Sequence, residues 1–381
     1  MSITYDWHRI RREYRKLGIP EGIFDPTDAP IERNKYFIIC TERSSGKTTN
    51  VLLLGLVCYR LYKTPIQYIR QTDDMLAPKN MTNLMHVIIS EGYVDKLTDG
   101  KYNTLVYKAR RWYYARMEDE EIKEQSPEAC AVCLSIQSNE VYKSSYNTNG
   151  DFIVFDEFCS LKRHLPDEFV KFCDLCSTII RSRTNPVIWL LGNTVDRYEY
   201  YFDELEIAEH IRYLQIGDSM EVKTSKGTPI YINLYSSGQK KQKSIVNRLF
   251  FGFKNTKLNA ITGDDWLIVP YQHIDSSDER EVIDRTHFLR YEEEILQLEV
   301  CVSEKYGLHV IVHRSTNHDP EGGSIYTCDQ INDIRYRFRF GHSRIDKMIW
   351  TLYDRNMFFY ATNSCASIMN KYINRAKNIK P

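Results

Sequence analysis

The sequence predicts an α/β protein with a mostly parallel sheet in its first two thirds, followed by a smaller second domain. Short apolar runs, typical of buried strands, alternate there with longer helical segments. A small, polar and basic stretch at 236–243 then separates this part from a second group of strands and helices. A chain of 381 residues is long enough for two such cores.

The N-terminal part opens with a basic, aromatic segment at 4–18, which we expect to be a helix ended by Gly18 and Pro20. The apolar runs and periodicities that follow predict strands, helices and one hairpin. The expected strands are 35–40, 65–70, 131–136, 151–155 and 187–191, the helices are 48–61, 82–91 and 167–181, and the hairpin arms are 103–107 and 111–114.

The composition change at 236–243 sets the expected domain boundaries. We predict a first domain over 1–236, a basic linker over 237–262 and a C-terminal domain over 263–381. The C-terminal part shows expected strands at 295–303, 308–313, 324–328 and 336–340, followed by helices.

Charge restricts the possible partners. The 51 lysines and arginines equal the 51 aspartates and glutamates, so a DNA surface must be a local patch and a histone-like coating role is disfavoured. The N-terminus lacks the order of a secretory signal, and the longest apolar run, Val51–Cys58, is too short to span a membrane. We therefore expect no membrane partner.

The ten cysteines lie mostly in apolar segments, which favours free buried thiols over disulfides. Two Cys-x-x-Cys pairs suggest zinc as an alternative. The pair at Cys130 and Cys133 falls within an expected strand, and the pair at Cys173 and Cys176 within an expected helix. Core packing is therefore the favoured interpretation of both.

A phosphate-binding loop is predicted where the strand at 35–40 meets the helix at 48–61. The segment reads Thr-Glu-Arg-Ser-Ser-Gly-Lys-Thr and ends in the Gly-Lys-Thr of a P-loop, in the strand–loop–helix context that the motif requires. Gly46 lets backbone amides approach phosphates, Lys47 reaches the β and γ oxygens, and Thr48 ligates Mg²⁺. The expected ATP-binding residues are Thr41, Arg43, Ser44, Ser45, Gly46, Lys47, Thr48 and Thr49.

A second motif supplies acids. Four apolar residues at 152–155 lead into Asp156 and Glu157, the arrangement of a Walker B strand. Asp156 would hold Mg²⁺ and Glu157 would orient the attacking water, whereas the alternative is a strand that ends in solvated acids. The next strand ends in Asn193 and Thr194, the candidates for sensing the γ-phosphate.

These motifs carry a resemblance to a known family. Arg43 within the loop, with Thr41 in place of the usual first glycine, resembles the deviant Walker A of large-terminase DNA-packaging ATPases. Lys143-Ser-Ser shortly before the acids looks like the basic turn of that family. The length and the small C-terminal domain are most similar to the packaging ATPases of phi-29-type phages. The resemblance covers most of 36–200 and is thinner beyond.

The resemblance implies an additional-strand, RecA/terminase-like P-loop ATPase domain over 1–236 and a small α+β, ribonuclease-H-like domain over 263–381. The latter would be vestigial as a nuclease, because Glu299 offers one acid without convincing partners. The implied activity is ATP-driven translocation of viral double-stranded DNA into a procapsid. The implied setting is a ring, typically a pentamer, at the procapsid vertex in the host cytoplasm, with the portal and a packaging RNA as candidate partners.

The family also implies residue roles. Arg43 would contact phosphate or hold Glu157 in an inactive pose. Arg181 or Arg183, the latter slightly favoured, would act as an arginine finger on the neighbouring subunit's nucleotide, although both could instead cap a helix C-terminus. Loop lysines would contact DNA phosphates, with solvation as the alternative. The candidates are Lys79, Lys143, Lys240, Lys241 and Lys243.

Two other functions remain open. A helicase, or another DNA-dependent P-loop ATPase, is disfavoured because helicase signatures are missing after Asn193. A nucleotide-gated scaffold that binds DNA or portal is disfavoured by Glu157, since a switch that need not hydrolyse ATP has less use for a base.

Overall fold

The computed structural model describes residues 4–41, 45–145, 150–159, 164–165, 167–181, 183–193, 199–235, 271–274, 278–291, 294–315 and 322–378. Contacts within the chain divide it into two compact units, Met1–Leu267 and Ile268–Pro381. The predicted linker over 237–262 lies outside the described residues.

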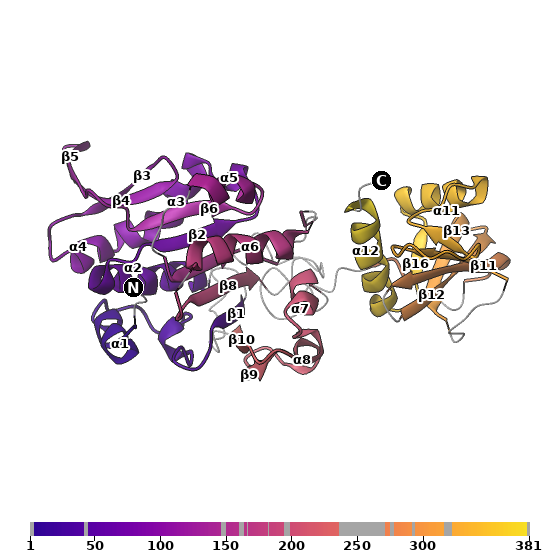
Figure 1. Cartoon of the computed structure of the whole chain (residues 1–381), viewed down its shortest axis with the longest axis horizontal. Coiled ribbons are helices and arrows are strands. Elements are labelled where there is room, and N and C mark those ends of the chain that lie inside the picture. Colours follow the sequence, from indigo (N-terminus) through magenta and orange to yellow (C-terminus); the bar gives the residue numbers. More distant parts are fainter. Residues whose placement is uncertain are drawn as a thin grey trace. The chain divides into compact units, whose positions relative to one another are not determined.

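The first unit is built on one large sheet (Figure 1). Its strands follow the order β3-β4-β6-β2-β7-β8-β1-β10-β9, and β5 pairs with β4. The six from β6 to β10 run parallel, and the outer strands are antiparallel. The strands are β1 (Tyr36–Thr41), β2 (Ile66–Arg70), β3 (Thr104–Lys108), β4 (Arg111–Glu118), β5 (Glu121–Gln125), β6 (Ala131–Ser135), β7 (Phe152–Asp156), β8 (Val187–Asn193), β9 (Ser219–Lys223) and β10 (Pro229–Tyr235).

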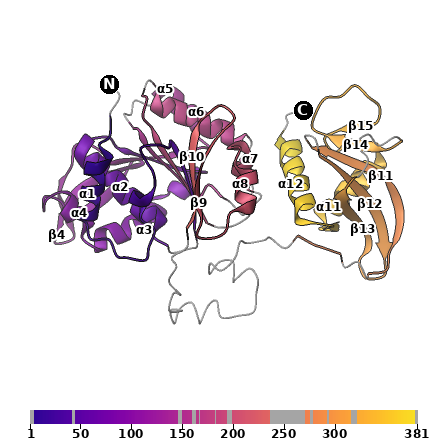
Figure 2. The same ribbon diagram turned by 90° about the horizontal axis from the view of Figure 1, so that it is seen from below.

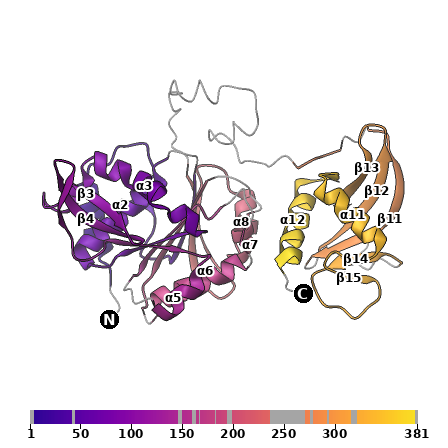
Figure 3. The ribbon, with the colours of Figure 1, turned by 90° about the horizontal axis from the view of Figure 1, so that it is seen from above.

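Helices cover both faces of this sheet, as Figures 2 and 3 show for α2 and α3 on one side and α5 and α6 on the other. The central strands are therefore buried on both faces, which explains their continuous apolar runs. The helices are α1 (Trp7–Arg15), α2 (Lys47–Tyr62), α3 (Pro78–Ser90), α4 (Tyr93–Leu97), α5 (Asn139–Ser145), α6 (Glu168–Ile180), α7 (Tyr200–Glu204) and α8 (Ala208–Tyr213), with short 3-10 turns η1 (Pro26–Asp28) and η2 (Asp73–Leu76).

Helix α2 lies against the centre of the sheet. Eleven of its 16 residues are buried, which confirms the predicted buried helix over 48–61. The close approach depends on Gly55, since a Cβ there would stand 2.7 Å from Ile66 Cδ1 on β2. The helix that begins at the predicted phosphate loop is thereby held directly on the strands that end near the predicted acids.

The second unit is a six-stranded sheet with order β15-β14-β11-β12-β13-β16. Helices α11 and α12 pack with the sheet around a common apolar core, on one side of it in Figure 3. The elements are β11 (Glu281–Tyr291), β12 (Glu294–Ser303), β13 (Gly307–Arg314), β14 (Ser324–Thr327), β15 (Tyr336–Phe338), α11 (Arg344–Asp354), β16 (Phe358–Tyr360) and α12 (Asn363–Asn378).

Strand β11 corrects the expectation that 295–303 is the first strand of the C-terminal domain. It precedes that segment and pairs with it in an antiparallel ladder. Two register shifts, between Val282 and Asp284 and between Asp284 and His287, break the alternation of its side chains. Sequence alternation therefore could not reveal it.

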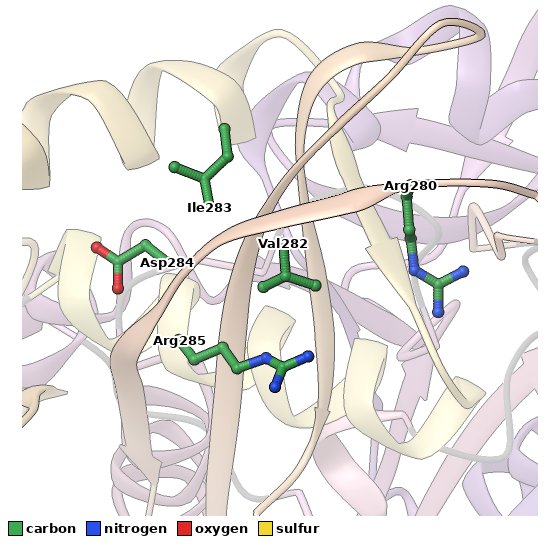
Figure 4. A pocket seen from close by; sticks show the side chains of 5 residues that line it. All are labelled: Arg280, Val282, Ile283, Asp284 and Arg285. Carbon is green, nitrogen blue, oxygen red and sulfur yellow. The ribbon is translucent and has the colours of Figure 1, made fainter.

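The bulged part of β11 borders a pocket of about 480 Å³ (Figure 4). Arg280, Val282, Ile283, Asp284 and Arg285 line it, and Ile283 stands on the opposite side of the strand from Val282. Three of its five lining residues are charged, so it offers little apolar surface to bury a ligand.

The acid that the sequence singled out in the second unit is paired with bases. Glu299 Oε1 lies 3.0 Å from Arg285 Nε and 3.6 Å from His313 Nε2. Over the described part of the chain, no group of three or more His, Cys, Asp or Glu side chains is placed to hold a metal ion.

All ten cysteines are free and nine are buried, as expected for core thiols. No helix within the described ranges has the length and apolar character to cross a bilayer.

Candidate nucleotide-binding site

The predicted phosphate loop connects the end of β1 to the start of α2. Gly46 precedes the helix with φ 79°, a left-handed conformation that favours glycine. The loop is closed across its base, where the hydroxyls of Thr41 and Ser45 lie 2.6 Å apart. Arg43 and Ser44 lie outside the described residues. The backbone N–H groups at this helix start form the kind of site that binds phosphate.

A segment from the N-terminal region covers this loop. The Phe24 N–H donates to the Ser45 carbonyl at 3.0 Å, and the Asn50 side chain donates to the Phe24 carbonyl at 2.6 Å. A Cβ on Gly46 would stand 3.4 Å from Ile23. These contacts could not be predicted from the sequence, because nothing in residues 19–25 resembles a binding motif.

The lysine and threonine of the loop meet the residues predicted for the two neighbouring strands. Lys47 Nζ donates to Asn193 Oδ1 at 2.7 Å, and Thr48 Oγ1 donates to Asp156 Oδ1 at 3.0 Å. These contacts follow from the sheet order, because β8 lies between β1 and β7 and all three are parallel. Their carboxyl ends therefore meet at one edge, the usual place for a ligand in such sheets.

Burial affects the charge of Lys47. Removal from water lowers the pKa of its ammonium group, and the nearby carboxylates of Asp156 and Glu157 counteract part of this shift. A buried cation whose charge is only partly compensated favours the approach of an anion. Lys47 is thus electrostatically suited to bind phosphate.

An arginine that the sequence analysis missed joins the two acids. Arg70, the last residue of β2, donates to Asp156 Oδ2 at 3.1 Å and to Glu157 Oε2 at 2.6 Å. Tyr68 also donates to Asp156 Oδ2, at 2.8 Å. Burial alone would lower the pKa of Arg70, but Tyr68, Asp156 and Glu157 raise it, so the group stays charged. The sequence signal for this residue was its polar side chain at the end of β2, a strand that pairs with β7.

Glu157 itself has an unusual backbone. Its φ is 58°, in the left-handed region that a glutamate rarely adopts, and its side chain is 54% exposed. The chain that follows packs tightly on β8, where a Cβ on Gly192 would lie 2.7 Å from Cys159 Sγ. The turn after β7 is therefore held in a strained conformation that carries the Glu157 carboxylate out toward solvent.

A pocket opens beside these groups on the side of α3. Its volume is about 550 Å³. The two acids and Arg70 form its polar wall, and α3 with Met75 forms the opposite one. The lining residues are Thr48, Tyr68, Arg70, Met75, Asn80, Met81, Asn83, Leu84, Asp156 and Glu157.

The two arginines predicted as finger candidates lie elsewhere. Arg183 Nε is 3.0 Å from Asp151 Oδ1, and its Nη1 donates to the Ile179 carbonyl at 3.2 Å. Burial raises the pKa of Asp151, which Arg183 opposes. Asp151 precedes β7, so this ion pair sits at the sheet edge opposite Asp156. Arg181 is exposed and caps α6.

The lysines predicted to lie on DNA-binding loops are placed differently. Lys79 lies in the first turn of α3, because Pro78 starts a helix there. Lys143 lies within α5, and nothing is described of its side chain. The loop positions were therefore wrong, and DNA binding by these residues stays a prediction. Thr49 lies in the first turn of α2. Thr194 and the three linker lysines Lys240, Lys241 and Lys243 fall outside the described residues.

Solved structures share this architecture. The Phi-28 gp11 DNA packaging motor matches with a TM-score of 0.58 at 15% identity, over 95% of this chain and 100% of that one. The bacteriophage Phi-29 viral genome packaging motor assembly matches with a TM-score of 0.52 at 17% identity, over 93% of this chain and 99% of that one. The chain has the fold of these packaging-motor proteins. No protein-family model and no curated protein sequence matches it.

The packaging-motor fold extends over both units of the chain, since both matches span nearly its whole length. The α/β prediction for the first unit and the separate sheet domain after it are thus confirmed. Within this packaging-motor fold, one sheet edge gathers a lysine, a hydroxyl, two carboxylates and an arginine. Such an edge can bind an anion and a divalent cation together.

Proposed function

We propose that the chain is an ATPase that drives double-stranded viral DNA into a procapsid. The observation that supports this most directly is the meeting of Lys47 with Asn193 and of Thr48 with Asp156 at one sheet edge. The similarity in fold to two viral packaging motors, over nearly the whole chain, supports the choice of DNA packaging among the uses of such a site.

The residues present fit Mg²⁺ and ATP. The left-handed Gly46 and the start of α2 offer backbone N–H donors to phosphate oxygens, and Lys47 adds a buried positive charge. Thr48 and Asp156 already share a hydrogen bond, so both oxygens face the position of a metal ligated by the two. When bound, Mg²⁺ would supply charge neutralisation at the phosphates. The candidate loop also includes Thr41, Arg43, Ser44, Ser45 and Thr49.

Glu157 is the candidate that orients water and accepts its proton. In this structure its carboxylate is bound to Arg70. Its Oε2 already accepts the hydrogen bond of the guanidinium, so this oxygen is not available to a water molecule. Glu157 therefore needs to leave Arg70 before it can accept a proton, and its exposed, strained turn leaves room for that movement. Asn193, bonded to Lys47, is the candidate γ-phosphate sensor, with Thr194 beside it in sequence.

The motor would work as a homo-oligomeric ring, which we propose to be pentameric, with an arginine from each subunit completing its neighbour's site. Arg181, at the C-cap of α6, and Arg183 are both candidates for this role, and Arg183 would have to leave the buried Asp151 to take it. Lys79, Lys143 and the linker lysines Lys240, Lys241 and Lys243 remain candidate DNA contacts. The proposed partners are DNA, the portal of the procapsid and a packaging RNA, at the procapsid vertex in the host cytoplasm. The second unit would be a vestigial, ribonuclease-H-like domain.

Hydrolysis in the presence of DNA tests the proposal. The purified chain should hydrolyse ATP faster when double-stranded DNA and procapsids are added. Glu157→Gln should keep ATP binding and lose about 10²–10⁴-fold in turnover, the usual contribution of a general base. Glu91→Gln, an exposed glutamate that ends α3, is the matched control and should leave turnover unchanged. Wild-type turnover in Glu157→Gln would contradict its role as base.

Two further assays separate the rival functions. A helicase would displace one strand of a duplex, whereas a packaging motor would translocate along the duplex and leave it paired. A nucleotide-gated scaffold would bind ATP and DNA without sustained turnover. Displacement of one strand from a duplex would replace the packaging proposal by a helicase. ATP hydrolysis that stops after a single turnover would replace it by a nucleotide-gated scaffold.

A further inference from the structure

A buried network of polar side chains lies behind the candidate site. His164 is its centre: its Nδ1 lies 3.2 Å from Glu168 Oε1, and its Nε2 bonds to Glu199. Glu168 also accepts from Gln71 at 2.7 Å and from the Tyr201 hydroxyl at 3.1 Å. We call these five residues the histidine cluster. The side chain of His164 is 13% exposed, and those of both glutamates are almost fully buried.

The cluster is stable only with a positive charge at its centre. Two carboxylates removed from water would repel each other and lose hydration without a cation between them. Burial alone would lower the pKa of His164, but the hydrogen bonds and charges of Glu168 and Glu199 raise it to about 10. The other titratable groups that face the ring are the hydroxyls of Tyr200 and Tyr201. His164 is therefore a cation at neutral pH.

The cluster joins the continuations of three strands that end at the candidate site. Gln71 directly follows Arg70 at the end of β2, and His164 lies on the segment after Glu157 and β7. Glu199 lies on the segment after β8 and Asn193, and it precedes α7. The protonated ring of His164 thus connects the chain segments that follow β2, β7 and β8. The last residues of these strands contact one another or Lys47.

A second contact holds two of these segments together. The Phe158 N–H donates to the Leu191 carbonyl at 3.3 Å, across β7 and β8. Gly192 leaves room for Cys159 against β8. This contact lies close to Glu157 and Asn193, whereas the histidine cluster fixes the same two segments farther along. The chain after β7 and the chain after β8 are thus linked to each other both next to the candidate site and at the histidine cluster.

We infer that His164 is a positioning residue that couples Glu157, Asn193 and Arg70, so that a movement of one at the nucleotide changes the position of the others. This inference rests on the proposed function for its catalytic consequence. His164 touches none of the reacting groups, and its effect passes through Gln71, the turn after β7 and the segment before α7. The competing explanation is that the histidine cluster only stabilises the positions of α6 and α7.

Kinetics of the full-length chain distinguish coupling from simple stabilisation. His164→Gln should lower kcat by about tenfold or more, because small misplacements of catalytic groups are costly. Nucleotide affinity, measured with a fluorescent ADP analogue, should stay within about twofold, since binding contacts are intact. His210→Gln, an exposed histidine on α8, is the control and should change neither quantity. A loss of kcat equal to that of His210→Gln would overturn the inference.

A double-mutant cycle tests the coupling itself. His164 and Asn193 are in separate networks, so independent effects of His164→Gln and Asn193→Ala on kcat would multiply. We expect the double variant to lose clearly less than the product, because either change already disturbs the shared segment. Multiplicative effects would contradict coupling. Glu199→Gln keeps the volume and one acceptor, and it replaces His164→Gln in the cycle where the latter fails to fold.

Amide hydrogen exchange tests the coupling without a measurement of ATP turnover. Arg70→Met should speed amide exchange in α7 (Tyr200–Glu204) by more than in α1 (Trp7–Arg15), which reports the general loss of stability, because Gln71 transmits the change through the cluster. In a Glu199→Gln background this increase should vanish. An Arg70→Met chain whose α7 exchanges like wild type would overturn the inference. A wild-type chain without ATPase activity would contradict the proposed function and still leave this result readable.

Discussion

Arg70 Nη2 lies 2.6 Å from Glu157 Oε2, so the acid proposed to activate water is held by a cation from the neighbouring strand. The same guanidinium contacts Asp156 at 3.1 Å and is 14% exposed. It is therefore the cation that the two acids share.

Arg70→Met should destabilise the protein and make it more dependent on Mg²⁺. Loss of the cation leaves Asp156 buried with its hydrogen bonds and only the charge of Lys47 nearby, and breaking a buried pair costs about 3–5 kcal/mol. Denaturant unfolding in EDTA measures this loss. Addition of Mg²⁺ and ATP should restore more stability to the variant than to the wild type, since a metal at Asp156 replaces the missing charge. Equal stabilisation of both proteins would show that Asp156 does not hold the metal.

Lys47→Ala should abolish nucleotide binding at concentrations where the wild type is saturated. The ammonium group is buried and makes charge-assisted contacts worth about 1.5–3 kcal/mol each. Titration with a fluorescent ATP analogue gives the affinity. Lys108→Ala removes an exposed lysine at the end of β3, and it is the matched control for loss of positive charge. Wild-type affinity in Lys47→Ala would remove the phosphate-loop assignment.

Arg183→Met should mainly lower stability, whereas Arg181→Met should mainly lower ATPase activity. The first leaves the buried Asp151 unpaired and should lower the free energy of unfolding by about 3–5 kcal/mol. The second changes an exposed side chain, so stability should stay within about 0.5 kcal/mol, while ring ATPase activity falls. Mixing Arg181→Met subunits with Asp156→Ala subunits should restore some active sites. Mixtures without recovery would show that Arg181 does not act across a subunit boundary.

Stability should depend on the protonation of His164 at high pH. Its pKa rises from 6.5 to about 10 on folding, so its contribution is complete below about pH 6.5 and is lost as the pH rises through 10. The stability difference between wild type and His164→Gln should therefore shrink between pH 7 and pH 10. Denaturant midpoints across this range measure it, with His210→Gln as the control. A difference that stays constant would mean that His164 is neutral in the folded protein.

The elements with continuous apolar runs could be predicted from the sequence, because strands buried on both faces and the helix at 48–61 leave an unmistakable pattern. Strand β5, with the sequence Glu-Ile-Lys-Glu-Gln, could not, since it is exposed along its length and pairs only through its backbone. Strand β11 was hidden by its bulges. Local pattern does not report pairing between distant segments.

The candidate site shows the same limit. Lys47, Thr48, Asp156 and Asn193 each end or begin an element with a strong local signal, and the structure brings them together. Arg70 carries no motif, and its importance arises only because β2 is the neighbour of β7 in the sheet. The burial of Arg183 against Asp151 likewise depends on contacts across the fold. Sequence reasoning finds such residues only when it also predicts strand order.

The left-handed backbone at Glu157 implies a conflict between stability and catalytic activity at this residue. A glycine at this position would adopt φ 58° without strain, and relief of such strain is worth about 1 kcal/mol. Glu157→Gly should therefore regain this strain energy, lose the ion pair to Arg70, which is worth about 0–1 kcal/mol at a half-exposed carboxylate, and fail to turn over ATP. The position whose backbone shape favours glycine thus carries the side chain that the proposed reaction needs.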